Sequence, residues 1–393
     1  MGTKERTRLA ILRKAPSLLP RPPLPSGEEP PARVLVIRPD HLGDMLLSFP
    51  ALRLLRQGLP QAHIAALVGP WAQAALAGTK DVDSVQTCPF PGFTRLPKGT
   101  PWAPYQLLRR EAQRLRLERY DVALVLRPDH WWGAMLAYLA GIPRRIGYDV
   151  PECVPFLSQA LPHQSDRHHV EQSLNLVRAL VGEGVLSRNE LSFQITPEDE
   201  LFAREIAGRW SGHGPVVLVH PGSGAPVKLW TASGFAQVAD VLVERYDARV
   251  VITGGPGEES LVRDVAHASG RAPHILMGAA LGQMAALLRL SALAVGLDSG
   301  IMHLAVAVGT PSIHLYGPVD RVVFGPWGLA DKHVVIISDL DCIPCNRLDY
   351  SSRKLAQHPC VRDIPPSRVL QAVERLLGLS APGRPGAQRE ALV

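Results

Sequence analysis

Residues 33–68 read RVLVIRPDHLGDMLLSFPALRLLRQGLPQAHIAALV, and this stretch decides the fold class. The apolar run 34–37 predicts a buried strand, and 64–68 predicts a second one. Between them, apolar residues recur on one face of a helix from Met45 to Leu55. A strand, a helix and a strand in succession are the unit of a parallel sheet. We therefore predict an α/β fold.

The second half of the chain restarts this pattern. Strands are expected at 216–219, 250–253, 293–296 and 312–315, and helices at about 232–246, 283–290 and 304–308. At 393 residues the chain is too long for one typical core and fits two domains. The sequence predicts two Rossmann-like domains that face each other across a cleft.

Five segments are expected along the chain. They are a disordered basic and proline-rich leader at 1–31, a first domain at 32–195, a second domain at 196–365, a helix at 366–380 that packs back on the first domain, and a disordered tail at 381–393. The basic leader predicts a peripheral contact with an anionic membrane surface, and an inert tail is the alternative interpretation.

The composition excludes several classes of protein. A hydrophobic fraction of 46% and a charged fraction of 20% are typical of a globular protein. The net charge of +6 is a mild excess and no basic helix is interleaved with aromatic residues, so no nucleic-acid partner is expected. No apolar run reaches the roughly 18 residues of a membrane span. The leader lacks the apolar core of a signal peptide and the five cysteines make no full disulfide framework, so we expect a cytoplasmic protein.

The string Arg-Pro-Asp-His occurs twice, at 38–41 and at 127–130, each time after an apolar strand and before a glycine. The simplest interpretation is that both loops lie at the same edge of one sheet, where ligands of such folds gather beyond the carboxyl ends of the strands. Chance repetition of good turn residues remains the alternative. Asp44 follows the first of these loops, where a carboxylate can act as a general base or cap a helix.

Two glycine-rich segments of the second half suit a phosphate group. Asp298-Ser299-Gly300 joins an expected strand to a helix, whose free N–H groups and positive dipole end favour an anion. Helix capping by Asp298 or Ser299 is the plain alternative, although His303 on the first turn favours a functional role. His220-Pro-Gly-Ser-Gly224 lets the backbone approach a pyrophosphate, and Lys228 adds a charge unless it is merely a solvated lysine.

No metal or other cofactor is expected. The Asp-x-Asp pairs at 81/83 and 339/341 lie away from the glycine-rich loops and are interpreted as surface turns. Helix N-termini and Lys228 can balance a diphosphate without a metal ion. Cys342-x-x-Cys345 and Cys360 supply three thiols where a structural zinc usually wants four ligands, and the spacing of His358 to Cys360 fits no common zinc site. The segment is interpreted as a structural loop element.

In this order, the motifs resemble those of glycosyltransferase family nine, the ADP-heptose:lipopolysaccharide heptosyltransferases. The resemblance runs from Arg33 to about Leu377. It is carried by 33–44 with Pro50-Ala51-Leu52, 220–224 with Lys228-Leu-Trp230, Gly296-Leu-Asp-Ser-Gly-Ile-Met-His-Leu-Ala305, Gly309-Thr-Pro311, Leu315-Tyr-Gly-Pro318 and the late cysteines.

The resemblance implies a GT-B fold, with the acceptor on the first domain and an ADP-sugar on the second. It implies an inverting transfer of heptose from ADP-heptose to the lipopolysaccharide inner core, at the cytoplasmic face of the inner membrane. Asp44 matches the family's general base. The expected donor phosphate and sugar-binding residues are Ser223, Gly224, Lys228, Asp298, Ser299, Gly300 and His303. The acceptor-side candidates are Arg38, Asp40, His41, Gly43, Arg127, Asp129 and His130.

The sequence departs from the family pattern at three places, one of which is the late cysteine segment, with fewer cysteines than in some members. Ile301 stands where proline or leucine is common, and the Arg127–His130 loop replaces the run expected of a core-heptose enzyme. Since that loop is expected to face the acceptor, a GT-B transferase that places a hexose on another surface glycan remains an alternative. A protein that binds a nucleotide sugar without catalysis is a further alternative, although Asp44, Lys228 and Asp298 are all present.

Overall fold

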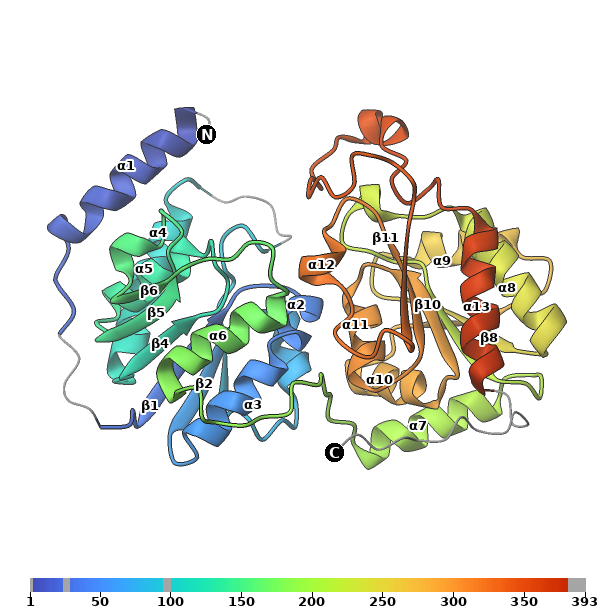
Figure 1. Ribbon diagram of the computed structural model, residues 1–393, viewed down its shortest axis with the longest axis horizontal. Helices are drawn as coiled ribbons and strands as arrows, with labels where there is room; N and C mark the ends of the chain where they lie inside the picture. Colours follow the sequence, from blue (N-terminus) through green and yellow to red (C-terminus); the bar gives the residue numbers. More distant parts are fainter. Residues whose placement is uncertain (1–2, 24–28, 95–99, 381–393) are drawn as a thin grey trace. The chain divides into compact units, whose positions relative to one another are not determined.

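The chain folds into two compact units, each built on its own parallel sheet of six strands (Figure 1). The structure is a computed structural model that describes residues 3–23, 29–94 and 100–380. Unit 1 runs to Gln194 and also includes Val322–Trp327, whereas unit 2 comprises Ile195–Arg321 and the chain from Gly328 onward. In the described residues, no helix has both the length and the apolar character required of a membrane span.

The sheet of unit 1 has the strand order β3-β2-β1-β4-β5-β6, and every pairing is parallel. This order reverses direction between β1 and β4, which makes a topological switch point at their carboxyl ends. The strands are β1 Arg33–Arg38, β2 His63–Val68, β3 Ser84–Thr87, β4 Val122–Val125, β5 Arg144–Tyr148 and β6 Gln159–Leu161.

Helices cover both faces of this sheet, with α3 packed against α6 and α4 packed against α5 (Figure 1). Such a cover explains why β1 and β4 are apolar along their whole length rather than alternating. The helices of this half are α1 Thr3–Leu18, α2 Leu42–Leu46, α3 Phe49–Gly58, α4 Ala103–Leu117, α5 Trp131–Leu139 and α6 His169–Val181, with 3₁₀ turns η1 Pro70–Leu76 and η2 Val154–Phe156.

Unit 2 repeats the topology, with the order β12-β11-β10-β7-β8-β9 and a switch point between β7 and β10. Its strands are β7 Val216–His220, β8 Arg249–Gly254, β9 His274–Met277, β10 Leu293–Leu297, β11 Ser312–Tyr316 and β12 His333–Ile337. The helices of this half are α7 Pro197–Gly208, α8 Ala232–Tyr246, α9 Glu259–Ala268, α10 Leu281–Leu290, α11 Gly300–Ala307, α12 Arg321–Phe324 and α13 Pro366–Ser380, with 3₁₀ turns η3 Pro226–Lys228 and η4 Ser352–Gln357.

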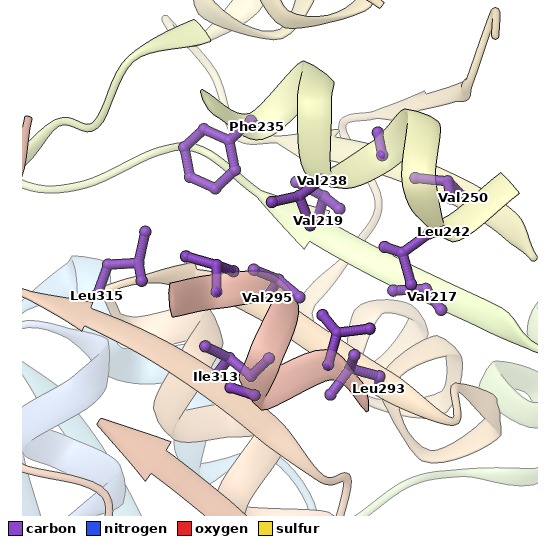
Figure 2. Packing of buried hydrophobic residues seen from close by; sticks show 14 of the residues in the cluster. Val217, Val219, Phe235, Val238, Leu242, Val250, Leu293, Val295, Ile313 and Leu315 are labelled. Carbon is purple, nitrogen blue, oxygen red and sulfur yellow. The ribbon is translucent and has the colours of Figure 1, made fainter. Parts of the chain in front are cut away.

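The core of unit 2 lies between the sheet and the helices α8 and α13 (Figure 2). Strand residues meet helix residues there, and the side chains labelled in the figure are Val217, Val219, Val250, Leu293, Val295, Ile313 and Leu315 from the strands and Phe235, Val238 and Leu242 from α8. Close packing of these branched side chains fixes the strand ends, from which the loops at the switch point project.

Two terminal segments differ from the prediction. The leader was expected to be disordered, but residues 3–18 form α1, and Leu9 and Leu12 are buried against unit 1. Apolar residues three positions apart give this basic segment one apolar side. The helix α13 was expected to pack on the first domain, but Val369 and Val373 lie in the core of unit 2. The expected tail at 381–393 lies outside the described residues.

Unit 1 is completed by a segment from far along the chain. Within this unit, the Trp327 indole N–H donates to the carbonyl oxygen of Asn189 at 2.7 Å, and its ring lies 4.6 Å from that of His168. The His168 Nε2–H donates to the carbonyl oxygen of Gly325 at 3.1 Å. The chain therefore returns to the first unit after most of the second has been formed.

Candidate functional site

The four loops singled out in the sequence follow the two central strands of each sheet. In unit 1 they follow β1 and β4, and in unit 2 they follow β7 and β10, so each pair lies at a switch point. In open α/β sheets this is the edge at which ligands bind. Each sheet therefore brings its own two loops together and carries a site of its own.

In unit 1, the two Arg-Pro-Asp-His loops are joined by ion pairs. The Arg38 Nε atom lies 3.0 Å from Asp40 Oδ2, and Arg127 contacts the other oxygen of Asp40. The Arg127 Nε–H also donates to Asp129 at 2.6 Å. Burial alone would raise the pKa of Asp40, but the charges of Arg38 and Arg127 outweigh it and hold that pKa well below its usual range. Asp40 is therefore ionised and locks the loops together.

Asp44 lies in the first turn of α2, at the rim of this network. The N-cap of α2 is His41, and it makes no side-chain capping hydrogen bond, so Asp44 is not the capping residue. The Asp44 side chain is 30% exposed, whereas Arg38 beside it is fully buried. The Asp44 Oδ1 atom lies 3.8 Å from Arg38 Nη2 and 3.7 Å from His169 Nδ1. A carboxylate in this position reaches solvent and can accept a proton.

The remaining acceptor-side candidates are half-buried or buried beside the loops. The His41 ring lies 5.2 Å from that of Trp71, and Gly43 lies in the first turn of α2. The His130 ring is only 5% exposed and meets Phe90 and Trp132. Burial is the main reason that the pKa of His130 is lowered to about 3, which keeps this imidazole neutral at neutral pH.

A cavity of about 440 Å³ opens beside the second loop of unit 1. It is lined by aromatic rings and by one ion pair, mainly Phe93, Tyr105, Trp131, Trp132, Arg127 and Asp129. The Arg127 guanidinium lies over the Phe93 ring at 5.1 Å. Since Asp40 and Asp129 already neutralise this guanidinium, the cavity presents flat apolar faces with a polar rim. Such a surface suits a sugar ring, which offers C–H faces and hydroxyl edges.

In unit 2, Lys228 and Asp298 form a buried ion pair between the two loops. The Lys228 Nζ atom lies 2.8 Å from Asp298 Oδ2, and the two side chains are 12% and 10% exposed. The Ser223 hydroxyl donates to the Asp298 main-chain oxygen at 2.9 Å. These contacts place Ser223, Lys228 and Asp298, three of the residues expected at the donor site, in one cluster.

The N-terminus of α11 points its main-chain N–H groups into the same edge of unit 2. Its N-cap is Ser299, whose hydroxyl makes no capping bond and no hydrogen bond with any other described residue. Gly300 is the first helical residue, and it leaves the backbone uncovered. Neither Asp298 nor Ser299 therefore caps the helix, and the helix terminus can receive an anion.

His303 lies on the same helix but is only 4% exposed. It faces the interior of unit 2 rather than the open end of the loop, together with Met302, which is fully buried. Further inside, the Ser312 hydroxyl lies 2.7 Å from His314 Nε2 and 2.8 Å from His333 Nδ1. His303 is therefore part of the buried interior next to this loop.

Sequence reasoning did not single out Glu258, which lies at the same edge of unit 2. Its Oε2 atom accepts a hydrogen bond from the Gly255 N–H at 2.7 Å and lies 4.0 Å from His220 Nε2. A Cβ atom at Gly222 would lie 2.1 Å from Glu258 Oε1, so a side chain there would displace the Glu258 carboxylate. The glycine-rich run after β8 was visible in the sequence, but its approach to the β7 loop was not.

The two Asp-x-Asp pairs and the late cysteines form no metal cluster among the described residues. Within the parts of the chain that the structure covers, no group of three or more His, Cys, Asp or Glu residues is arranged to hold a metal ion. Asp83 accepts hydrogen bonds from Arg56 and from the Ile64 N–H, and Asp339 pairs with Arg368. Cys342 and Cys345 are exposed free thiols, and Cys360 is buried.

The chain is similar in sequence to known proteins. A family model described as glycosyltransferase family 9 (heptosyltransferase) matches residues 108–355. The lipopolysaccharide heptosyltransferase 2 of Escherichia coli K12 is 25% identical over 372 residues, which cover 88% of this chain and 98% of that protein.

Two solved structures are similar in fold. The glycosyl transferase family 9 protein of Veillonella parvula has a TM-score of 0.74 at 24% identity and covers 91% of this chain and 100% of its own. The E. coli ADP-heptose lps heptosyltransferase II has a TM-score of 0.69 at 24% identity and covers 89% and 100%. With two parallel six-stranded sheets in the chain, these matches confirm the expected GT-B fold.

Proposed function

The chain belongs to glycosyltransferase family 9, the heptosyltransferases, and from this premise we propose that it transfers a heptose from ADP-heptose to the lipopolysaccharide inner core. The name of the E. coli relative supports the acceptor class, and the name of the similar E. coli structure, an ADP-heptose heptosyltransferase, supports the donor. The proposed reaction inverts the anomeric centre in a single displacement. The observation that carries it is that each unit has at its own switch point a group that one half of the reaction needs, a carboxylate in unit 1 and a phosphate-type site in unit 2.

Asp44 is the proposed general base. The acceptor hydroxyl gives its proton to the Asp44 carboxylate as its oxygen attacks the anomeric carbon of the donor. The bond from that carbon to the phosphate oxygen breaks, and ADP leaves with the electron pair. The partial exposure of Asp44 and its place at the sheet edge support this role.

The donor diphosphate is proposed to bind between Lys228 and the N-terminus of α11. An ammonium group, the Ser223 hydroxyl and main-chain N–H groups converge there, and all of them favour negative charge on the leaving group. In this proposal Lys228 contacts both the diphosphate and Asp298. Protein groups then balance the negative charge of the diphosphate, which a divalent ion would otherwise do. Glu258, close to Gly222, is suited to accept hydrogen bonds from donor hydroxyl groups.

The acceptor saccharide is proposed to enter the aromatic cavity of unit 1. Trp131 and Phe93 offer faces for a sugar ring, and Asp129 is exposed enough to accept hydrogen bonds from hydroxyl groups. Because the Arg127 charge is already balanced by two carboxylates, the cavity favours an uncharged ring over one that carries a carboxylate or a phosphate.

A peripheral contact with the cytoplasmic face of the inner membrane completes the proposal. The exposed residues of α1 include the basic Arg6, Arg13 and Lys14 and the apolar Ile11 and Leu18. Basic side chains next to exposed apolar ones favour an anionic lipid surface. Sedimentation with anionic vesicles tests this contact, because Arg13→Glu combined with Lys14→Glu is expected to reduce the bound fraction.

The deciding experiment is a donor panel. The protein is incubated with truncated core oligosaccharides and with ADP-heptose, UDP-hexoses or GDP-hexoses, and the products are identified by mass spectrometry. A mass increase of one heptose with the ADP donor alone is the expected result. Turnover with a hexose donor and none with ADP-heptose would replace the proposal with the hexosyltransferase alternative, and binding without turnover would favour the non-catalytic alternative.

A further inference from the structure

Two consecutive histidines begin the helix α6. His168 is the N-cap of α6, and its Nδ1 atom accepts a hydrogen bond from the Val170 N–H at 3.1 Å. His169 follows as the first helical residue and is only 3% exposed. His168 therefore has a clear role as the N-cap of α6. Capping does not explain why His169 is buried.

His169 is buried beside the carboxylate of Asp44. The His169 Nδ1 atom lies 3.7 Å from Asp44 Oδ1. The Phe324 ring covers the imidazole edge-on within unit 1, with 5.2 Å between the ring centres. The contact joins residues 125 positions apart (44 and 169), on α2 and α6.

Arg38 approaches the same carboxylate from β1. Its Nη2 atom lies 3.8 Å from Asp44 Oδ1 and donates to the Asp44 main-chain oxygen at 3.3 Å. The side-chain contacts that His169 and Arg38 make with Asp44 both go to Oδ1. Because both contacts go to the same oxygen, they favour one orientation of the carboxylate toward an incoming hydroxyl group.

The surroundings of His169 keep its imidazole neutral. Burial has the largest effect on its pKa and, together with the positive charge of Arg38, lowers that pKa well below the usual value. Arg127 and His168 act in the same direction, and Asp40 opposes them. A neutral imidazole whose Nδ1–H faces Asp44 stabilises the charged carboxylate across this 3.7 Å separation without adding a second positive charge, which would weaken the carboxylate as a base.

We propose that His169 is a positioning residue for the general base, which it orients through Nδ1 while Arg38 holds the same carboxylate from the other side. This inference rests on the proposed function, because it presumes that Asp44 accepts the proton of the acceptor. Seven buried nitrogen and oxygen atoms of Arg38, Asp40, His130 and His169 have no aligned hydrogen bond with another described residue. Such a concentration is typical of a site arranged for a reacting partner rather than for stability.

Two amide substitutions of His169 separate orientation from packing. The amide nitrogen of asparagine superposes on histidine Nδ1, whereas that of glutamine superposes on Nε2. His169→Asn therefore keeps a donor toward Asp44, and His169→Gln keeps the polarity but moves the donor away. His169→Phe keeps ring volume and removes the donor altogether. His168→Asn keeps the N-cap of α6 but removes the bond to Gly325, and it is therefore the control for a packing change beside His169.

The readout is kcat against pH with saturating ADP-heptose, together with donor KM. In His169→Gln and His169→Phe, kcat is expected to fall about 10- to 100-fold with little change in donor KM, because a misplaced base affects the chemical step. The acidic limb of the profile should move to higher pH, because loss of a donor to the charged carboxylate raises its pKa. His169→Asn and His168→Asn should stay within about threefold of the wild type with an unmoved limb.

Equal profiles for His169→Asn and His169→Gln would overturn the proposal, since packing alone would then explain the residue. This contrast decides the question even if His169→Phe does not fold, and thermal unfolding of each variant confirms that unit 1 is intact. Failure of the proposed function would look different, because the wild type itself would transfer no heptose from ADP-heptose.

Discussion

The ion pair between Lys228 and Asp298 gives a prediction that combines stability with binding. Replacing Lys228 with alanine leaves the Asp298 carboxylate, which is 10% exposed, without its partner. At 2.8 Å and an effective dielectric constant of about 20, the attraction between the two charges is about 6 kcal/mol before the cost of desolvation. Removal of one partner of a buried pair typically costs about 3–5 kcal/mol, and the partial exposure of both side chains favours the lower end.

We therefore expect Lys228→Ala to lower the stability of unit 2 by about 3 kcal/mol. For a unit of this size, that loss corresponds to a fall in Tm of about 6–12 °C. The double variant Lys228→Ala/Asp298→Asn should recover most of the loss, because no charge is then left buried without a partner. Calorimetry measures the unfolding of both variants beside the wild type.

ADP provides the second half of the test. At an ADP concentration of 100 times Kd, the wild type should gain about 2.7 kcal/mol of stability. Both variants should lose most of this gain, because the charge that faces the diphosphate has been removed. A Tm of Lys228→Ala within about 2 °C of the wild type, with the ADP response retained, would refute the reasoning. The ion pair would then add no net stability, and Lys228 would not bind the diphosphate.

Four further predictions concern single residues. Asp44→Asn should lower kcat by about 10²- to 10⁴-fold and leave ADP binding unchanged, as measured by single-turnover assays and calorimetry. Gly222→Ala should raise donor KM by about tenfold (about 1.4 kcal/mol), because the new methyl group meets the Glu258 carboxylate; an unchanged KM would show that this loop yields. Trp131→Ala should raise acceptor KM by a similar factor with donor KM unchanged. The pKa of His130 is lowered to about 3, so the folded protein favours the neutral imidazole. The contribution of His130 to the stability of unit 1 is therefore full above pH 6.5 and decreases as the pH falls toward 3. The loss is about 2 kcal/mol at pH 5, and His130→Gln should remove it from the pH dependence of urea unfolding.

The fold was largely predictable because its strands are buried on both faces. Apolar runs such as 34–37 and 216–219 correspond to β1 and β7, and the strand–helix–strand alternation indicated parallel sheets. The two terminal helices were misassigned for a physical reason. Periodicity in α1 and α13 shows that each has an apolar face, but it does not show which surface that face will cover.

The candidate site was predictable only where its residues follow one another in sequence. Asp44 and Asp298 were found because each lies in a loop directly after a strand. Helix capping remained an open alternative until the N-cap residues, His41 and Ser299, were seen to make no side-chain capping hydrogen bond. His169 and Glu258 were not found. Each reaches the site through the folding of a separate element, and one sequence carries no signal of that approach.

The segment Val322–Trp327 has a consequence for how the protein is made. Part of unit 1 is synthesised only after β11 has been translated, so residues 1–194 leave the ribosome before their fold can close around Trp327. Until then, the start of α6 lacks its acceptor at Gly325, and the Asn189 carbonyl lacks its indole donor. A gene fragment that stops at residue 194 therefore encodes an unfinished domain, and a split version of the protein would need to carry this peptide in its first half.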